Sequence, residues 1–256
     1  MNTTDYILET RQLTRTFSTP DGPLHAVNNL TLNIERGKTV ALLGSNGAGK
    51  STLINMMINL DKPSSGFLSV CGQTAAQAQS QSLVTAIMQS GGLLPEWTVR
   101  ETIVTMCAIR KQSHRVDEIT QKSGVQTFLN RHIRDCSGGQ VQRLRLALAL
   151  ITPGELLILD EPTAGMDPHA RRELWNEINA LHDQGITILC ATHFLDEATR
   201  NADDIVVMHK GQLLAHGTLT EILDLTSTHS LDEAFFALTD TADSQISQPT
   251  LHPTRH

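Results

Sequence analysis

The stretch Thr39-Val-Ala-Leu-Leu-Gly-Ser-Asn-Gly-Ala-Gly-Lys-Ser-Thr52 joins a short apolar run to a glycine-rich turn and a lysine. From Gly44 onward it matches the pattern G-x-x-x-x-G-K-[ST]. After Lys50, apolar residues recur at helical spacing, as at Leu53 and Met56. The stretch therefore predicts a strand, a loop and a helix, which is the structural context in which this pattern binds phosphate.

This loop has the chemistry of a phosphate cradle. Its glycines let backbone N–H groups turn towards phosphate oxygens, and the helix that follows directs its positive dipole end at the same charge. We expect Lys50 to reach the β- and γ-phosphates and the Ser51 hydroxyl to coordinate magnesium. A glycine-rich turn without function is the alternative, and the strand-loop-helix context weighs against it. The residues predicted to bind nucleotide are Gly44, Ser45, Asn46, Gly47, Ala48, Gly49, Lys50, Ser51 and Thr52.

Other apolar runs also end at polar residues, namely at Gln89, Asp160 and Thr192-His193. Buried parallel strands have this pattern when ligands bind beyond their carboxyl ends. Residues 6–35 are typical of short strands around a polar turn, whereas residues 99–135 have helical spacing. We therefore expect an α/β fold with a mainly parallel sheet, an N-terminal β region and an inserted helical lobe.

The apolar run that begins at Leu156 delivers two adjacent carboxylates, Asp160 and Glu161, at its end. A strand of this kind can hold Asp160 near magnesium and leave Glu161 to polarise the attacking water as general base. On its own, an acidic pair after an apolar run is equally compatible with a solvated turn.

A second glycine-containing helix start follows Asp135, at Ser137-Gly-Gly-Gln140. It again presents a hydroxyl and bare backbone N–H groups to an anion. Two phosphate-binding helix starts in one small domain are hard to explain with one site. If both bind nucleotide, the second serves a triphosphate that another subunit holds.

The composition limits the class of partner. The 256 residues carry a formal net charge of -7, and no basic stripe is present, so we expect no nucleic-acid partner. The four cysteines form no CxxC pair, which favours reduced, structural thiols in a cytosolic chain. No window approaches the roughly 20 apolar residues of a membrane helix, and residues 1–10 lack the features of a secretory signal. We expect a soluble chain that needs a separate partner for any membrane role.

Six motifs between Tyr6 and Leu238 resemble, in order, those of ABC transporter ATP-binding subunits. They are the Walker A loop (Gly44–Thr52), the Q-loop glutamine (Gln89), the signature (Cys136–Gln140), Walker B (Leu156–Glu161), the D-loop (Ala164–Asp167) and the switch histidine (His193). The resemblance implies a P-loop NTPase core with an N-terminal antiparallel β subdomain and an α-helical lobe inserted at about residues 95–150. We expect the domain to span residues 1–239 and residues 240–256 to form a disordered tail.

The resemblance further implies an ATPase that uses ATP and Mg²⁺. Gln89 and His193 join Glu161 as catalytic residues in this interpretation. Gln89 would sense the metal and pass its state to the helical lobe, and His193 would contact the γ-phosphate. The implied metal ligands are Ser51, Gln89 and Asp160. Without the resemblance, a lone histidine after a strand is at least as often structural.

The resemblance also implies a shared site and two kinds of partner. The residues that would contact the opposite subunit's nucleotide are Ser137, Gly138, Gly139 and Gln140, and Asp167 would lie at the dimer seam. One partner is a second ATP-binding subunit, expected to be identical. The other is a separate integral membrane permease, which would hold the chain at the cytoplasmic face of the membrane.

Two positions depart from the family pattern. Phe17 lies where the family usually places a tyrosine that stacks on adenine, and an ordinary core phenylalanine is the alternative. Cys136 stands where the signature usually has leucine, and we expect it to be tolerated because the anion contacts come from the residues after it. The stretch between Gln89 and Ser137 is compact for the family, which leaves the details of the coupling surface open.

The C-terminal segment helps to distinguish the kinds of ABC protein. Residues 230–239 resemble the short C-terminal helix of ATPases that serve drug, lipid or polysaccharide exporters, although a closing amphipathic helix would have the same pattern. The main alternative is a soluble ABC ATPase that acts on ribosomes or nucleic acid, but the chain has neither a coiled-coil insertion nor a second cassette. A P-loop kinase or GTPase would have no use for the Ser137 helix start.

Overall fold

Two β-sheets and a group of helices make up residues 5–89 and 91–246, which a computed structural model describes. The larger sheet has six strands in the order β5-β6-β7-β3-β8-β9. They are β5 (Val84–Ile87), β6 (Leu156–Asp160), β7 (Thr187–Thr192), β3 (Thr39–Leu43), β8 (Asp204–His209) and β9 (Gln212–Gly217). Only β8 and β9 pair antiparallel within this sheet. The predicted mainly parallel sheet is confirmed.

The central strands β3, β6, β7 and β8 are buried along their whole length. One face of the sheet packs against Leu53 of helix α1 (Lys50–Met57), and the other packs against Leu174 of helix α6 (Pro168–His182). Helices on both faces leave no solvated side, which explains why these strands read as continuous apolar runs. Two shorter helices are α2 (Ala75–Ser80) and α7 (Leu195–Asn201).

The smaller sheet is antiparallel, in the order β2-β1-β4, with β1 (Tyr6–Thr19), β2 (Gly22–Glu35) and β4 (Ser65–Val70). Its hairpin turn falls at residues 20–21, inside the predicted polar turn. The two hairpin strands are longer than the short strands that the sequence predicted, and their pairing continues across several shifts in register. The hairpin places Phe17 opposite Leu24.

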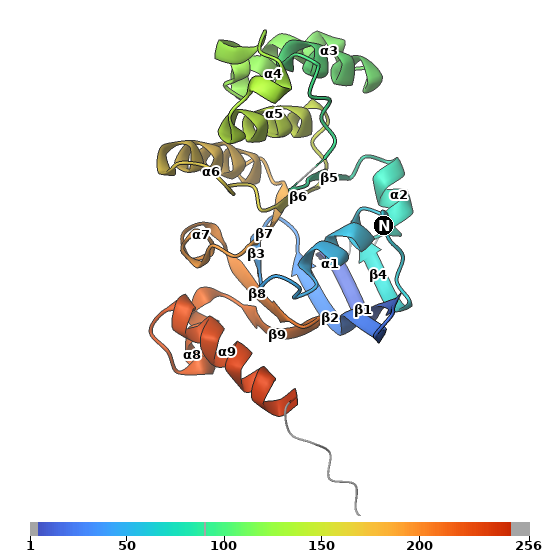
Figure 1. Ribbon diagram of the computed structural model, residues 1–256, viewed down its shortest axis with the longest axis vertical. Coiled ribbons are helices and arrows are strands. Elements are labelled where there is room, and N and C mark those ends of the chain that lie inside the picture. Colours follow the sequence, from blue (N-terminus) through green and yellow to red (C-terminus); the bar gives the residue numbers. More distant parts are fainter. Residues whose placement is uncertain (1–4, 90, 247–256) are drawn as a thin grey trace, which may run out of the picture.

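The predicted helical lobe is present and has its own core. Its helices are α3 (Val99–Ile109), α4 (Val116–Lys122) and α5 (Gly138–Ile151), joined by short 3-10 turns η1 (Ser113–Arg115), η2 (Val125–Phe128) and η3 (Ile133–Asp135). Val99, Ile103, Ile119 and Leu144 are buried together in this lobe. Figure 1 shows the lobe at one end of the molecule, beyond the edge strand β5.

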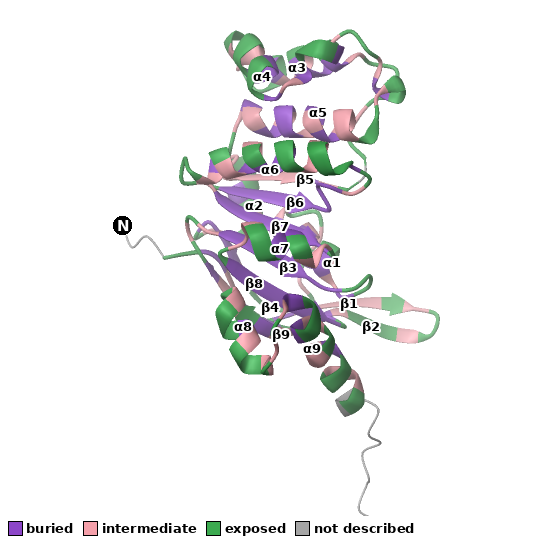
Figure 2. Ribbon diagram, turned by 90° about the vertical axis from the view of Figure 1, so that its left-hand side faces the viewer, coloured by how far each residue is buried: buried purple, intermediate pink, exposed green. Residues whose placement is uncertain are grey.

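At the opposite end lie helices α8 (Leu219–Thr226) and α9 (Leu231–Ile246). The predicted end of the domain at residue 239 needs correction, because α9 continues to Ile246. Hydroxyl groups of Thr239, Thr241 and Ser244 donate to backbone carbonyls one turn earlier, so the helix itself satisfies these polar side chains. Residues 247–256 of the predicted tail lie outside the described residues. Figure 2 shows that much of the surface of α9 is exposed.

Burial of the cysteines agrees with their predicted structural role. Cys71, Cys107 and Cys190 are buried as free thiols, and burial raises the pKa of the Cys71 thiol to about 12. Within residues 5–89 and 91–246, no helix is both long and apolar enough to span a membrane.

Candidate nucleotide site

The phosphate loop leaves β3 at Gly44 and ends at the N-terminus of α1. Gly49 is the N-cap of this helix and has a φ of 101°, with no side chain capping the N–H groups. A Cβ atom at Gly49 would lie 2.2 Å from the carbonyl oxygen of Ala26. Only glycine fits this backbone, because both the left-handed conformation and the close approach of β2 exclude a side chain. The result is an open helix start directed at one end of the sheet.

This helix start opens into a pocket of 640 Å³. Predicted residues from five distant segments of the chain line it together: Phe17, Ser45, Asn46, Gly47, Ala48, Gly49, Lys50, Ser51, Thr52, Gln89, Asp160, Glu161 and His193. Gly44 does not line the pocket, but its carbonyl oxygen accepts a hydrogen bond from Lys50, which does. The carboxyl ends of β3, β6 and β7 carry most of these residues, as the topology of an open parallel sheet requires.

Lys50 crosses the base of the pocket. Its ammonium group donates to the carbonyl oxygens of Gly44 at 2.5 Å and of Ser45 at 3.5 Å. Burial lowers the pKa of Lys50, while Glu161 and Asp160 act in the opposite direction. The lysine is thus a desolvated cation with few competing water contacts, and its attraction for a phosphate anion is correspondingly stronger.

Asp160 and Ser51 meet at the same end of the sheet. The Ser51 hydroxyl lies 3.5 Å from Asp160 Oδ2. Burial raises the pKa of the Asp160 carboxyl, and the neighbouring Glu161 raises it further, against Lys50 and Ser51. A hard divalent cation fits these oxygen donors, since it would offset the repulsion between two buried carboxylates. Across the described ranges, no three His, Cys, Asp or Glu side chains cluster as a metal site.

Glu161 and His193 form a pair in which the glutamate is buried and the histidine side chain is 53% exposed. The Nδ1 atom of His193 lies 2.9 Å from Glu161 Oε1, and the glutamate is 7% exposed. Glu161 has a φ of 51°, a left-handed conformation that costs a residue with a side chain about 1–3 kcal/mol. Its N–H group donates to Ala191 of β7 at 2.9 Å. Neighbouring strands therefore fix the backbone that carries this carboxylate.

The Ser137 helix start lies apart from this pocket. Ser137 caps α5, in the lobe, and none of residues 137–140 lines the pocket around Lys50. Ser137 and Gly138 are exposed. A Cβ atom on Gly138 would meet the carbonyl oxygen of Gly165 at 3.8 Å, and one on Gly139 would meet Met166 Cε at 3.7 Å. The signature and the D-loop thus form one surface of the chain.

Asp167 shapes the end of that surface. It caps α6, where its Oδ1 atom accepts from the N–H groups of His169 and Ala170 at 2.9 and 3.0 Å. Those backbone hydrogen bonds, the one from Ala170 foremost, lower the pKa of the Asp167 carboxyl. The fold therefore accounts for Asp167 as a helix cap at the protein surface.

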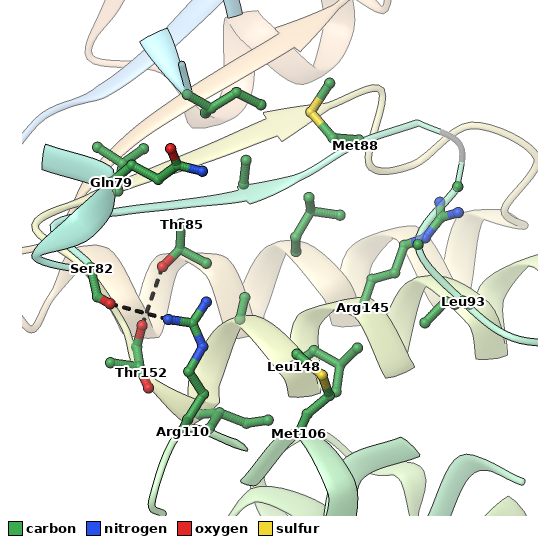
Figure 3. A pocket seen from close by; sticks show the side chains of 18 of the residues that line it. Gln79, Ser82, Thr85, Met88, Leu93, Met106, Arg110, Arg145, Leu148 and Thr152 are labelled. Carbon is green, nitrogen blue, oxygen red and sulfur yellow. Dashed lines mark hydrogen bonds between the residues drawn. The ribbon is translucent and has the colours of Figure 1, made fainter. Parts of the chain in front are cut away.

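Gln89 connects the nucleotide pocket to a groove beside the lobe. Its carbonyl oxygen accepts from the guanidinium group of Arg145 at 2.9 Å. Arg145 lines a separate groove of 410 Å³ between β5, α3 and α5. Figure 3 shows Met88, Leu93, Met106 and Leu148 around this groove, together with Arg110 and Arg145.

The sequence did not single out four residues that line the nucleotide pocket: Leu24, His25, Ala26 and Lys210. The first three lie on β2, across the hairpin from Phe17. The prediction of Phe17 as a pocket residue could therefore have identified its neighbours on β2 as well. Lys210 precedes Gly211 in the turn between β8 and β9. A Lys-Gly pair between two apolar runs indicates a turn, but not which pocket the turn borders.

A phosphate loop, an acidic strand end and a mainly parallel sheet define a P-loop NTPase. The family model described as "ABC transporter" matches residues 27–164, more than half of the chain. The chain belongs to the ABC transporter family, as an ATP-binding subunit that hydrolyses ATP.

Individual relatives and solved structures agree with this assignment. The "Nod factor export ATP-binding protein I" of Cupriavidus metallidurans is 36% identical over 77% of this chain and 68% of its own length. Its namesake from Rhizobium etli is 34% identical over 79% and 66%. A structure described as the ATP-binding subunit of an ABC transporter covers 91% of this chain and 99% of its own, with a TM-score of 0.80 and 29% identity. CbiO1 from Clostridium perfringens, part of the transporter complex cbiONQ, gives 0.74 at 28% identity over 86% and 92%. The predicted fold class is confirmed.

Proposed function

We propose that this chain powers an exporter by closing on a second ATP-binding subunit around two ATP molecules. The observation that carries the proposal is the separation of Ser137 from the Lys50 pocket. An exposed helix start beside the D-loop offers N–H groups and a hydroxyl to an anion that its own chain does not hold there. A second copy, related by two-fold symmetry, would bring its phosphate loop to this surface and receive the same in return.

Within each site, the chain's own residues divide the chemistry. Lys50 and the loop N–H groups bind the phosphates, and Phe17 stacks on adenine. Ser51, Asp160 and Gln89 would hold Mg²⁺, which supplies charge neutralisation at the phosphates. Glu161 accepts a proton from the attacking water, and His193, which contacts Glu161, orients that carboxylate and reaches the γ-phosphate.

The partner in the membrane would dock in the groove of Figure 3. The groove is apolar around Met106 and Leu148, and Arg145 joins it to Gln89 of the nucleotide site. A change at Gln89 therefore has a short route to whatever fills the groove. This arrangement would place the chain at the cytoplasmic face, next to a separate permease. The export-named relatives and the amphipathic α9 support export as the direction.

Glu161→Gln tests the mechanism. The amide keeps the shape of the side chain but cannot accept the proton, so turnover should fall by about 10²- to 10⁴-fold. ATP should then hold two chains together, visible as a dimer in size-exclusion chromatography. A double variant that also carries Lys50→Ala should remain monomeric. A Glu161→Gln chain that stays monomeric and hydrolyses ATP at the parental rate would contradict the proposal.

Purification of the intact complex from membranes tests the partner. We expect a membrane subunit to copurify, and Arg110→Glu in the groove to reduce its recovery while ATP binding persists. Arg200→Glu on α7, whose side chain is 75% exposed, is the matched control. Recovery with ribosomes instead of a membrane subunit would favour the alternative class of soluble ABC ATPase.

A further inference from the structure

The turn between β8 and β9 packs directly on the phosphate loop. The N–H group of Gly211 donates to the carbonyl oxygen of Ala48 at 2.9 Å, and the Gly211 carbonyl accepts from Asn28 of β2 at 2.8 Å. Lys210 precedes this glycine and lines the nucleotide pocket with Phe17 and the loop. The turn thus brings a cation to the pocket from a strand pair that carries none of the family motifs.

Lys210 is held by the C-terminal helix. Its ammonium group donates to Asp243 Oδ1 at 2.7 Å, and the Nε2 atom of His209 lies 2.8 Å from the same oxygen. Asp243 belongs to the last turns of α9, beyond the predicted end of the domain. Hydrogen bonds from Lys210, and then from His209, lower the pKa of the Asp243 carboxyl. Through Asp243, helix α9 therefore contacts a residue that lines the nucleotide pocket.

Lys210 can exchange the carboxylate of Asp243 for another anion. The side chains of Lys210 and Asp243 are 56% and 49% exposed, and water screens pairs of that kind so that they contribute little stability. A lysine is a point charge on a flexible stem, able to turn from one anion to another. A nucleotide bound at the loop would place several phosphate charges within the same pocket, where they compete with a single carboxylate.

We propose that Lys210 is a further nucleotide-binding residue and that Asp243 competes with the nucleotide for it. The C-terminal helix then restrains nucleotide binding by holding Lys210. Because coupling is reciprocal, bound nucleotide releases Asp243 and loosens the last turns of α9. The inference rests on the proposed nucleotide site at the phosphate loop.

Titration calorimetry with ADP, which avoids turnover, tests the competition in the full chain. Lys210→Met should weaken binding about two- to fivefold, since an exposed cation is lost. Asp243→Asn should tighten binding by a similar factor, because Lys210 is freed and a nearby negative charge is removed. The double variant should bind like Lys210→Met alone. Lys122→Met is the matched control, since Lys122 forms an exposed pair with Glu118 on the lobe at 2.9 Å, and it should leave affinity unchanged.

Two outcomes would overturn the inference. Lys210→Met could bind ADP with parental affinity, or the tightening by Asp243→Asn could persist when Lys210 is absent. Hydrogen exchange of residues 240–246 gives an independent readout: it should rise on addition of ADP in the parental chain but not in Lys210→Met, and equal exchange in both would also overturn it. Lys50→Ala separates this failure from that of the site itself, because a wrong nucleotide site would leave its ADP binding intact.

Discussion

The starts of α1 and α5 are both glycine-containing helix N-termini, but the fold satisfies their N–H groups in different ways. At α1 no side chain caps the helix. At α5 the Ser137 hydroxyl accepts from the Gln140 N–H group at 3.3 Å, and Gln140 Oε1 accepts from the Ser137 N–H group at 3.0 Å. An uncapped start calls for a ligand in place of a side chain, whereas a capped start is stable as it stands.

The two helix starts also differ in their surroundings. The start of α1 lies inside a pocket whose walls come from its own chain. The start of α5 lies on the surface of a lobe with a separate core. The Ser137 hydroxyl that accepts one hydrogen bond still has a hydrogen to donate, so its cap does not prevent contact with an anion. The start of α1 thus belongs to the part of the nucleotide site that this chain supplies, whereas the start of α5 would contact a nucleotide only in the proposed dimer.

The largest effect should come from Lys50→Ala. Loss of a buried cation that faces the phosphates should cost about 3 kcal/mol, or on the order of 10²-fold in ATP affinity. Ser137→Ala should leave the affinity of the single chain within about twofold, because residues 137–140 do not line that pocket. Calorimetry at protein concentrations that keep the chain monomeric makes this comparison. Equal losses in both variants would show that the two starts serve one site in one chain.

Ser137→Ala should instead lower turnover. Removing a hydroxyl that donates to a phosphate of the opposite subunit should cost about 1.5–3 kcal/mol, or on the order of 10-fold or more in ATPase rate. The same change removes a helix cap, worth about 1 kcal/mol of folding stability. Thr218→Ala is the matched control, because Thr218 caps α8 with the same reciprocal pattern, completed by Glu221. If Thr218→Ala lowers turnover as much, lost stability explains both results.

Phe17→Ala should have a smaller effect, confined to the nucleotide pocket. The Arg15 guanidinium lies 4.4 Å from the centre of the Phe17 ring, so one face of the ring is already covered. Stacking of adenine on the other face should contribute about 1–2 kcal/mol, or about 5- to 30-fold in the half-saturating ATP concentration. Phe17→Tyr should keep parental affinity. An unchanged value in Phe17→Ala would favour the role of a packing residue.

Much of this site was predictable because one parallel sheet gathers distant residues. Gly44, Gln89, Asp160 and His193 each follow an apolar run, and parallel strands deliver their carboxyl ends to one edge. The C-terminal boundary was not predictable in this way. The segment after Leu238 is rich in Thr, Ser, Gln and Pro and was predicted to be a tail on that composition. In α9, however, the hydroxyls of Thr241 and Ser244 bond back to the helix, and Asp243 accepts from Lys210. The contact between Lys210 and Asp243 spans 33 residues of sequence, so no local sequence pattern predicts it.

The smallest effect should come from Cys136→Leu, which separates the two functions of the signature segment. Cys136 is partly buried against the core of the lobe, and its thiol donates to the His132 carbonyl oxygen at 3.4 Å. A leucine exchanges that weak hydrogen bond for more apolar contact, so stability should change by less than about 1.5 kcal/mol.

Turnover of Cys136→Leu should stay within about twofold of the parental rate, because this side chain packs into its own lobe. Gly139→Ala provides the contrast. Its added methyl group would meet Met166 Cε at 3.7 Å and Ala170 Cβ at 3.8 Å, which are ordinary contacts, so the single chain should fold normally. A partner's phosphate that approaches the α5 N–H groups would nevertheless meet that methyl group, and the ATPase rate should fall. Equal rates in the two variants would mean that the surface after Cys136 contacts no second nucleotide.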